Sequence, residues 1–171
     1  MALKKSLLWG NIAVSSMSAG TIVMAWIIEK QCSILPAEAS ERITLIIASI
    51  SVFAFMLSML REIVKDMEDM EGDKLIHCRS LPIIKGLPFT KKVLILLVAI
   101  TFVLLIIAQN YLLQFSKVLA VVWLVLAVEV PLVYFLVKLR KAESRTDFHT
   151  LSSMLKLIML GGIVAIIAGQ F

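Results

Sequence analysis

Five long apolar runs dominate the chain, and short polar or charged segments separate them. Each run covers roughly 18–23 residues, which lets a helix cross the ~30 Å hydrocarbon core of a bilayer. None alternates apolar and polar residues as the strands of a membrane β-barrel do. The pattern predicts an all-α, multi-pass transmembrane helix bundle, a single membrane domain over residues 1–171, with helices at about 6–28, 43–60, 93–111, 118–137 and 151–170.

The composition supports this fold class. Hydrophobic residues make up 60% of the chain and the mean hydropathy is +0.98, whereas a soluble domain is about 45–50% apolar. The first run contains several small or hydroxyl residues, and the last contains Gly161-Gly162. Such residues in membrane helices are typical of close helix–helix contacts, so we expect both helices to pack against neighbours.

Basic residues are distributed unevenly between the two sides that five helices define. One side carries only Lys30, Arg42 and Lys117, and the other carries Lys4, Lys5, Arg61, Lys65, Lys74, Arg79, Lys85, Lys91, Lys92, Lys138, Arg140, Lys141 and Arg145. Because cytoplasmic segments carry the excess of Lys and Arg, we expect an integral protein of the cytoplasmic (cell) membrane. Its N-terminus and residues 61–92 would be cytoplasmic and its C-terminus outside. The net charge of +5 then reflects topology, and no nucleic-acid partner is expected.

Half of the acidic residues lie in one short stretch, residues 61–73, directly after the second apolar run. On a helix, Glu62, Asp66, Asp69 and Asp73 fall within an arc of about 60°, while Glu68 and Glu71 point to the far side. Ile63, Met67 and Met70 form an apolar face opposite the four carboxylates, and Gly72 is expected to end or bend the helix. Carboxylates so close repel each other unless a cation lies between them, and Mg²⁺ favours such oxygen ligands. The stretch predicts a metal-binding platform at a membrane surface.

Other polar residues have more than one interpretation. Asn11 could contact a ligand or bridge two helices, and bridging is preferred. Glu129 is the one acid within a span, and it is either a functional carboxylate or a neutral, hydrogen-bonded acid at a helix contact. His77 and His149 lack the spacing of a metal site and are expected in loops. Cys32 and Cys78 fall on opposite sides of the membrane, so no disulfide is expected.

The acidic stretch, together with Cys78-Arg79-Ser80-Leu81-Pro82-Ile83, closely resembles the second aspartate-rich motif of the UbiA superfamily of intramembrane prenyltransferases. The similarity is greatest to the geranylgeranylglycerol-phosphate geranylgeranyltransferase branch. Weaker similarities cover residues 3–11 and 147–161. Two positions depart from the motif: Ser80 stands where the family usually has Thr, and His77 where it has Gly. The His77 position could need a positive φ, which strains a residue with a side chain.

The resemblance implies a Mg²⁺-dependent enzyme that moves a polyprenyl group from its diphosphate to an acceptor. A glycerophosphate ether lipid is the favoured acceptor, and an aromatic quinone precursor is the alternative. By the same resemblance, Asp69 and Asp73 are the catalytic pair, and the metal ligands are Asp66, Asp69, Asp73 and Glu62. The residues expected to bind the diphosphate are Lys65, Arg79, Arg61 and Lys74.

The resemblance covers only part of the family pattern. Family members have nine helices and two facing aspartate-rich motifs, whereas this sequence resembles helices five to nine and lacks the first motif. Three hypotheses follow. The chain is half of an enzyme, completed by a separate N-terminal half or by upstream coding sequence, or it is an inactive truncated remnant. Alternatively, it is a non-catalytic small membrane protein that binds or transports cations. Five helices alone would also leave polar faces exposed, so we expect a separate N-terminal half or a second copy of the chain, as a homo-oligomer, to cover them. Membrane lipid would surround the rest.

Overall fold

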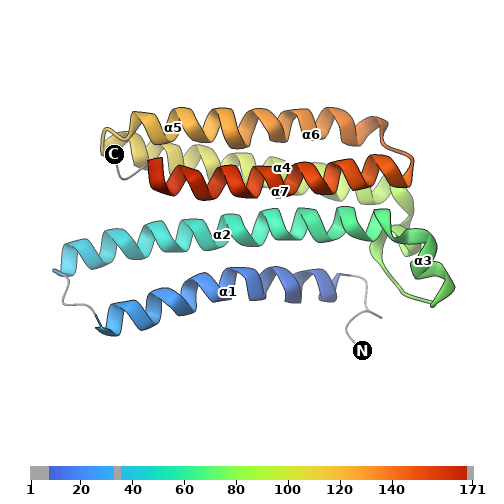
Figure 1. Cartoon of the computed structure of the whole chain (residues 1–171), viewed down its shortest axis with the longest axis horizontal. Helices are drawn as coiled ribbons and strands as arrows, with labels where there is room; N and C mark the ends of the chain where they lie inside the picture. Colours follow the sequence, from blue (N-terminus) through green and yellow to red (C-terminus); the bar gives the residue numbers. More distant parts are fainter. Residues whose placement is uncertain (1–7, 33–35, 169–171) are drawn as a thin grey trace.

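The computed structural model describes residues 8–32 and 36–168, and the predicted helix ends at residues 6 and 170 lie outside them. Its elements are α1 (Trp9–Cys32), α2 (Ala37–Glu68), α3 (Met70–Leu75), α4 (Leu81–Gln114), α5 (Val118–Leu124), the π-helix η2 (Val125–Glu129), α6 (Val130–Lys141) and α7 (Arg145–Ala168). Within the described ranges, five helices are long and apolar enough to cross a membrane, with α5, η2 and α6 forming one of them. The predicted helical bundle is confirmed (Figure 1).

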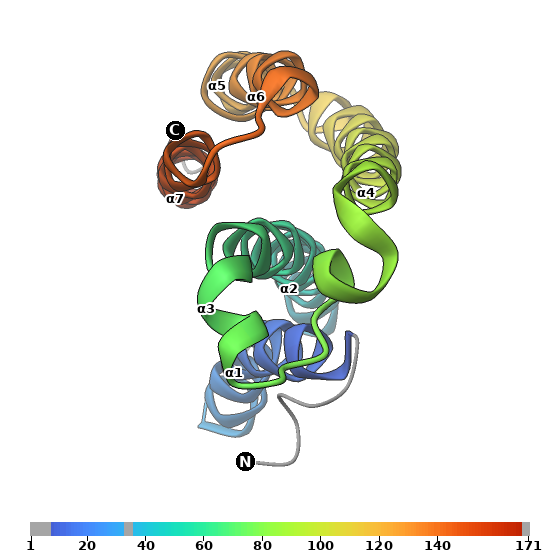
Figure 2. The same ribbon diagram turned by 90° about the vertical axis from the view of Figure 1, so that its right-hand side faces the viewer.

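Helix α2 is the centre of the bundle. It packs against α1 on one side and against α4 and α7 on the other. Figure 2 shows α2 between α1 and a curved row formed by α4, α5–α6 and α7. The short helix α3 lies at the end of α2, at the same end of the bundle as the α6–α7 connection (Figure 1). Residues that follow α2 are therefore close to the start of α7.

The best-packed part of α2 is the end that leads into the acidic stretch. Ile63, Val64 and Met67 are at most 2% exposed. They belong to one core cluster with large side chains of α4, α6 and α7, among them Phe135 and Phe148. Ile63 and Met67 are on the apolar face expected from the sequence, while Met70 beyond the end of α2 is only half-buried. The burial of this apolar face holds the acidic segment against the rest of the bundle.

The predicted cytoplasmic segment, residues 61–92, is largely helical. A helix was expected as far as Gly72, but the start of α4 at Leu81 falls where a loop was expected, which corrects that boundary. Helix α2 continues to Glu68, α3 follows, and α4 begins at Leu81. The buried apolar face explains the continuation of α2, since it needs helical spacing to stay against the core. The bend comes at Asp69, where α2 ends and α3 begins, and Gly72 lies inside α3. The bend predicted at Gly72 therefore occurs three residues earlier, at Asp69.

Helix α3 ends in a turn that requires a left-handed residue. The Cys78 N–H donates to the Asp73 carbonyl at 2.9 Å and the His77 N–H to the Lys74 carbonyl at 3.3 Å. This pair of bonds is the Schellman pattern, whose turn residue is usually Gly. Here it is His77, with a φ of 53°. The positive φ suspected at His77 is confirmed.

The start of α4 is bent. Pro82 lies in its first turn, where a missing N–H has no cost. Gly86 then has a φ of 79° and a ψ of 164°, so the helical path is interrupted there. Pro88 follows two residues later. The first turn of α4 can thus lie across the end of the bundle, as Figure 2 shows.

Glu129 lies at a contact between two spans. The Gln109 side-chain amide donates to its carboxylate at 2.7 Å, which links α4 to η2. Glu129 ends the π-helix, and Pro131 follows within the first turn of α6. Of the two interpretations of Glu129, the hydrogen-bonded helix contact matches this geometry. The partner Gln109 had no signal in the sequence analysis.

Gly161 is a position where α7 lies close to the π-helix. A Cβ at this position would lie 2.8 Å from the Ala127 carbonyl oxygen, whereas a Cβ at Gly162 would meet nothing within 4 Å. The indole N–H of Trp123 also donates to the Gly161 carbonyl, at 3.0 Å. Of the two glycines expected to pack tightly, Gly161 does so, because the Ala127 carbonyl group and Cβ leave no room for a side chain.

The two glycines give a matched pair of variants. Gly161→Ala should lower the free energy of unfolding by about 1–3 kcal/mol relative to Gly162→Ala, because it forces the Ala127 backbone to move. Gly162→Ala should be neutral or slightly stabilising, since Ala is the better helix former. Denaturation of the purified protein in mixed micelles, followed by circular dichroism, measures the difference. Equal stability of the two variants would contradict the close packing at Gly161.

A second prediction concerns the turn after α3. His77→Gly should relieve the left-handed strain and stabilise α3 by about 1 kcal/mol. Amide hydrogen exchange in residues 70–78 should then slow roughly fivefold, because this short helix opens locally. His77→Ala is the control, since it removes the imidazole but keeps the Cβ. If both variants exchange at the same rate, the strain at this position is not what limits α3.

Candidate functional site

Asp66, one of the four residues of the predicted carboxylate face, lies on the side of α2 that meets α1. The Asn11 side-chain amide donates to Asp66 Oδ2 at 2.8 Å. Asn11 thus bridges α1 and α2, as preferred from the sequence, and it does so at a predicted site residue. The charges of Asp73, Glu62 and Asp69 all act on the Asp66 carboxylate. Asp73, Glu62 and Asp69 are thus near enough to Asp66 for their charges to repel its carboxylate.

Glu62 differs from the other three acids because it already has a cationic partner. Arg61 Nη1 lies 2.7 Å from Glu62 Oε1, and both side chains are partly exposed. A partly exposed pair of this kind contributes little to stability. The pairing matters because it makes Glu62 less available as a metal ligand and Arg61 less available to bind a diphosphate.

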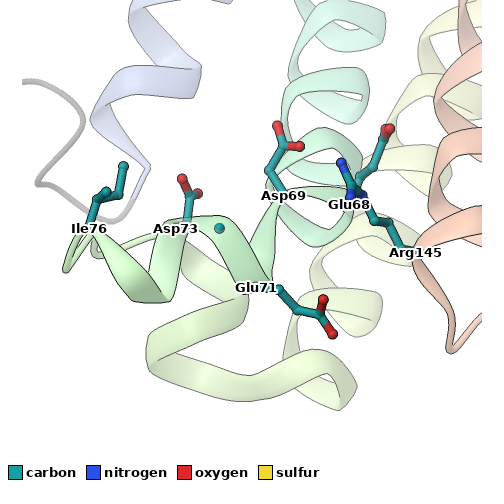
Figure 3. A pocket seen from close by; sticks show the side chains of 7 residues that line it. Glu68, Asp69, Glu71, Asp73, Ile76 and Arg145 are labelled. Atoms are coloured by element: carbon teal, nitrogen blue, oxygen red, sulfur yellow. The ribbon is translucent and has the colours of Figure 1, made fainter.

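A cavity of about 340 Å³ opens at the bend between α2 and α3. Its walls are formed by Glu68, Asp69, Glu71, Gly72, Asp73, Ile76 and Arg145. In Figure 3, Asp69 and Asp73 point to the same side of the bend, and Glu71 points away from them. Glu68 and Glu71 line this cavity together with the two aspartates, although a straight helix would put them on the far side. The bend at Asp69 accounts for that difference.

Glu68 also connects α2 to α7. His149 Nδ1 lies 2.8 Å from Glu68 Oε1, so the two side chains share a hydrogen bond. His149 was expected in a loop, but it lies within the first two turns of α7. The start of α7 is therefore fixed against the end of α2, next to the cavity.

The basic residues predicted to bind a diphosphate are not the ones that line the cavity. Lys65, Lys74 and Arg79 are exposed, and none of them is among its lining residues. The lining contains Arg145 instead, from the first position of α7. Sequence reasoning counted Arg145 only among the cytoplasmic charges. Its proximity to Asp69 and Asp73 depends on the packing of α7 against α2, for which the sequence has no local signal.

The carboxylates match part of a magnesium site. Across residues 8–32 and 36–168, no three His, Cys, Asp or Glu side chains are grouped closely enough to hold an ion by themselves. Mg²⁺ is nevertheless commonly held by one or two carboxylates, with phosphate oxygens and waters as the remaining ligands. Asp69 and Asp73 line the same cavity and could supply such a partial set, because their oxygen donors suit this ion. The third predicted aspartate, Asp66, is not among the lining residues.

Comparison with known proteins relates nearly the whole chain to one family. The UbiA prenyltransferase family matches residues 1–160. The digeranylgeranylglyceryl phosphate synthase of Methanothermobacter thermautotrophicus is 33% identical over 173 aligned residues, which cover 98% of this chain and 54% of that protein. The enzyme of the same name from Methanosphaera stadtmanae is 28% identical over 169 residues, covering 98% of this chain and 56% of that protein.

A third relative matches over a shorter region. The digeranylgeranylglyceryl phosphate synthase of Pyrococcus furiosus is 38% identical over 84 residues, which are 49% of this chain and 26% of that protein. The chain spans about half the length of the first two curated relatives, and no solved structure matches it. Since the family match extends over nearly all of the sequence, the chain belongs to the UbiA prenyltransferase family.

Proposed function

We propose that this chain contributes the second aspartate-rich wall of an intramembrane prenyltransferase site. The site would transfer a polyprenyl group from its diphosphate to an acceptor in the membrane. The observation that carries the proposal is the position of Asp66, Asp69 and Asp73 around the bend at one end of a five-span bundle, in a chain of the UbiA family. The names of the relatives favour a glycerophosphate ether lipid as acceptor, and an aromatic quinone precursor is the alternative.

The carboxylates would hold Mg²⁺, with Asp69 and Asp73 as the main ligands and Asp66 beside them. When bound, the ion would neutralise negative charge on the departing diphosphate. Asn11 supports this role of Asp66, because its donated hydrogen bond occupies one carboxylate oxygen and leaves the other for a ligand. Glu62 would act from the edge of the group, since Arg61 already holds it.

Cations around the carboxylates would bind the diphosphate oxygens. Lys65 precedes Asp66 on α2, and Arg79 and Lys74 flank the turn after α3. Their exposed side chains are long enough to swing toward a substrate that approaches the bend. Charged hydrogen bonds of this type hold phosphate groups well. The opposite wall, with the first aspartate-rich motif, would come from polypeptide outside residues 1–171, either a separate half or a longer chain.

We further propose that this site faces the cytoplasm. The end of the bundle that contains α3 and the α6–α7 connection carries most of the Lys and Arg residues, which favours the cytoplasmic side. Cys78 lies at that end, and Cys32 lies at the other. The two thiols are therefore natural reporters of orientation.

The metal and substrate roles can be tested by binding. Asp69→Asn and Asp73→Asn should each weaken Mg²⁺-dependent binding of geranylgeranyl diphosphate by about tenfold or more, or ~1.4 kcal/mol. Glu38→Gln, at the start of α2 and far from the bend, is the control for loss of one acid. Isothermal titration in nanodiscs measures the affinities. A cation-binding or transport protein without a prenyl site would respond to Mg²⁺ but not to the prenyl diphosphate.

The orientation can be tested by thiol labelling. A membrane-impermeant maleimide added to intact cells should modify the exposed Cys32, and Cys78 should react only after permeabilisation. Cys32→Ser should then abolish labelling of intact cells, which controls for reagent leakage. Mass spectrometry of the modified peptides identifies the site. Labelling of Cys78 from outside would reverse the proposed topology.

A further inference from the structure

We propose that Arg145 binds the diphosphate of the prenyl donor from the α7 side of the cavity, opposite the aspartates of α2 and α3. This inference rests on the proposed function and adds a substrate-binding residue that the motif does not contain. Among the described side chains that line the cavity, Arg145 is the one cation. The other charged side chains of the lining are all carboxylates: Glu68, Asp69, Glu71 and Asp73.

Local structure fixes the backbone that carries Arg145. Asp147 Oδ2 accepts hydrogen bonds from the Glu143 and Ser144 N–H groups, at 3.1 and 3.0 Å. Ser144 Oγ accepts the Asp147 N–H at 3.2 Å in return. This reciprocal arrangement is a capping box, which defines where a helix begins. Arg145 is therefore the first residue of a helix with a well-defined start.

Tertiary packing then places that helix start beside the cavity. Phe148, one turn into α7, is 2% exposed and belongs to the same core as Ile63 and Met67 of α2. The hydrogen bond between His149 and Glu68 adds a polar link between the two helices. Figure 3 shows the Arg145 side chain extending from α7 toward the end of α2.

The guanidinium of Arg145 is available to a ligand. Within the described residues it forms neither an ion pair nor a hydrogen bond, although four carboxylates line the same cavity. Glu68 is engaged by His149 instead. A guanidinium offers up to five N–H donors in a planar fork, which suits two oxygens of one phosphate group.

The charge balance of the cavity also favours this role. A diphosphate next to Asp69 and Asp73 is repelled unless cations separate the two sets of negative charge. Mg²⁺ held by the aspartates would satisfy one side of the diphosphate, and Arg145 would satisfy oxygens on the other side. Arg61, by contrast, is paired with Glu62, and Lys65, Lys74 and Arg79 do not line the cavity.

The test compares Arg145→Gln and Arg145→Lys with Arg140→Gln in the full chain. Arg140 is an exposed cation at the end of α6 that does not line the cavity, so its variant controls for loss of one positive charge. The probes are geranylgeranyl diphosphate and inorganic pyrophosphate, each titrated with Mg²⁺ present. Arg145→Gln should weaken binding of both probes by ~10–100-fold, as expected for loss of a charged hydrogen bond.

The remaining readouts separate substrate binding from other effects. Arg145→Lys should keep part of the affinity, since it restores the charge but not the fork, and Arg140→Gln should bind as the unaltered chain does. Wild-type affinity in Arg145→Gln, or an equal loss in Arg140→Gln, would overturn the role of Arg145 and leave the proposed function standing. If the unaltered chain binds neither probe, the proposed function and this inference both fail.

Discussion

The arrangement of this protein depends on the amphipathic end of α2. A transmembrane helix that continues into a run of acidic residues would fray at the membrane surface unless something held it. Here Ile63, Val64 and Met67 hold it by being buried against α4 and α7. These residues follow the apolar run, and burial of their side chains stabilises the helix where charged residues begin. The carboxylates on the other face can then repel one another without unwinding it.

The features that could be predicted from the sequence are those that depend on a short segment alone. The five spans follow from hydropathy, which is a local property of each segment. The common neighbourhood of Glu62, Asp66, Asp69 and Asp73 follows from helical spacing, which is also local. The turn at His77 was anticipated from a single departure from the family motif. In each of these cases a few consecutive residues carry the information.

Other features depend on contacts between distant segments, and sequence reasoning missed them. Residues 81–92 were not expected to be helical, because polarity alone does not separate a surface helix from a connector. The bend at Asp69 brings Glu68 and Glu71 into the lining of one cavity with Asp69 and Asp73, although Glu71 points away from the two aspartates. The partners Asn11 of Asp66, Gln109 of Glu129 and His149 of Glu68 all come from other helices. No spacing rule within one segment identifies such pairs.

The unequal packing along α2 has a mechanical consequence. All of its buried residues lie between Ser51 and Met67, and its first half, from Ala37 to Ile50, has none. The two halves of one helix thus differ in rigidity, because local stability follows the density of buried contacts. The end of α2 that leads into the carboxylates is therefore held by many buried contacts, while the opposite end is held by far fewer. A change in packing at the far end would leave the spacing of the carboxylates intact.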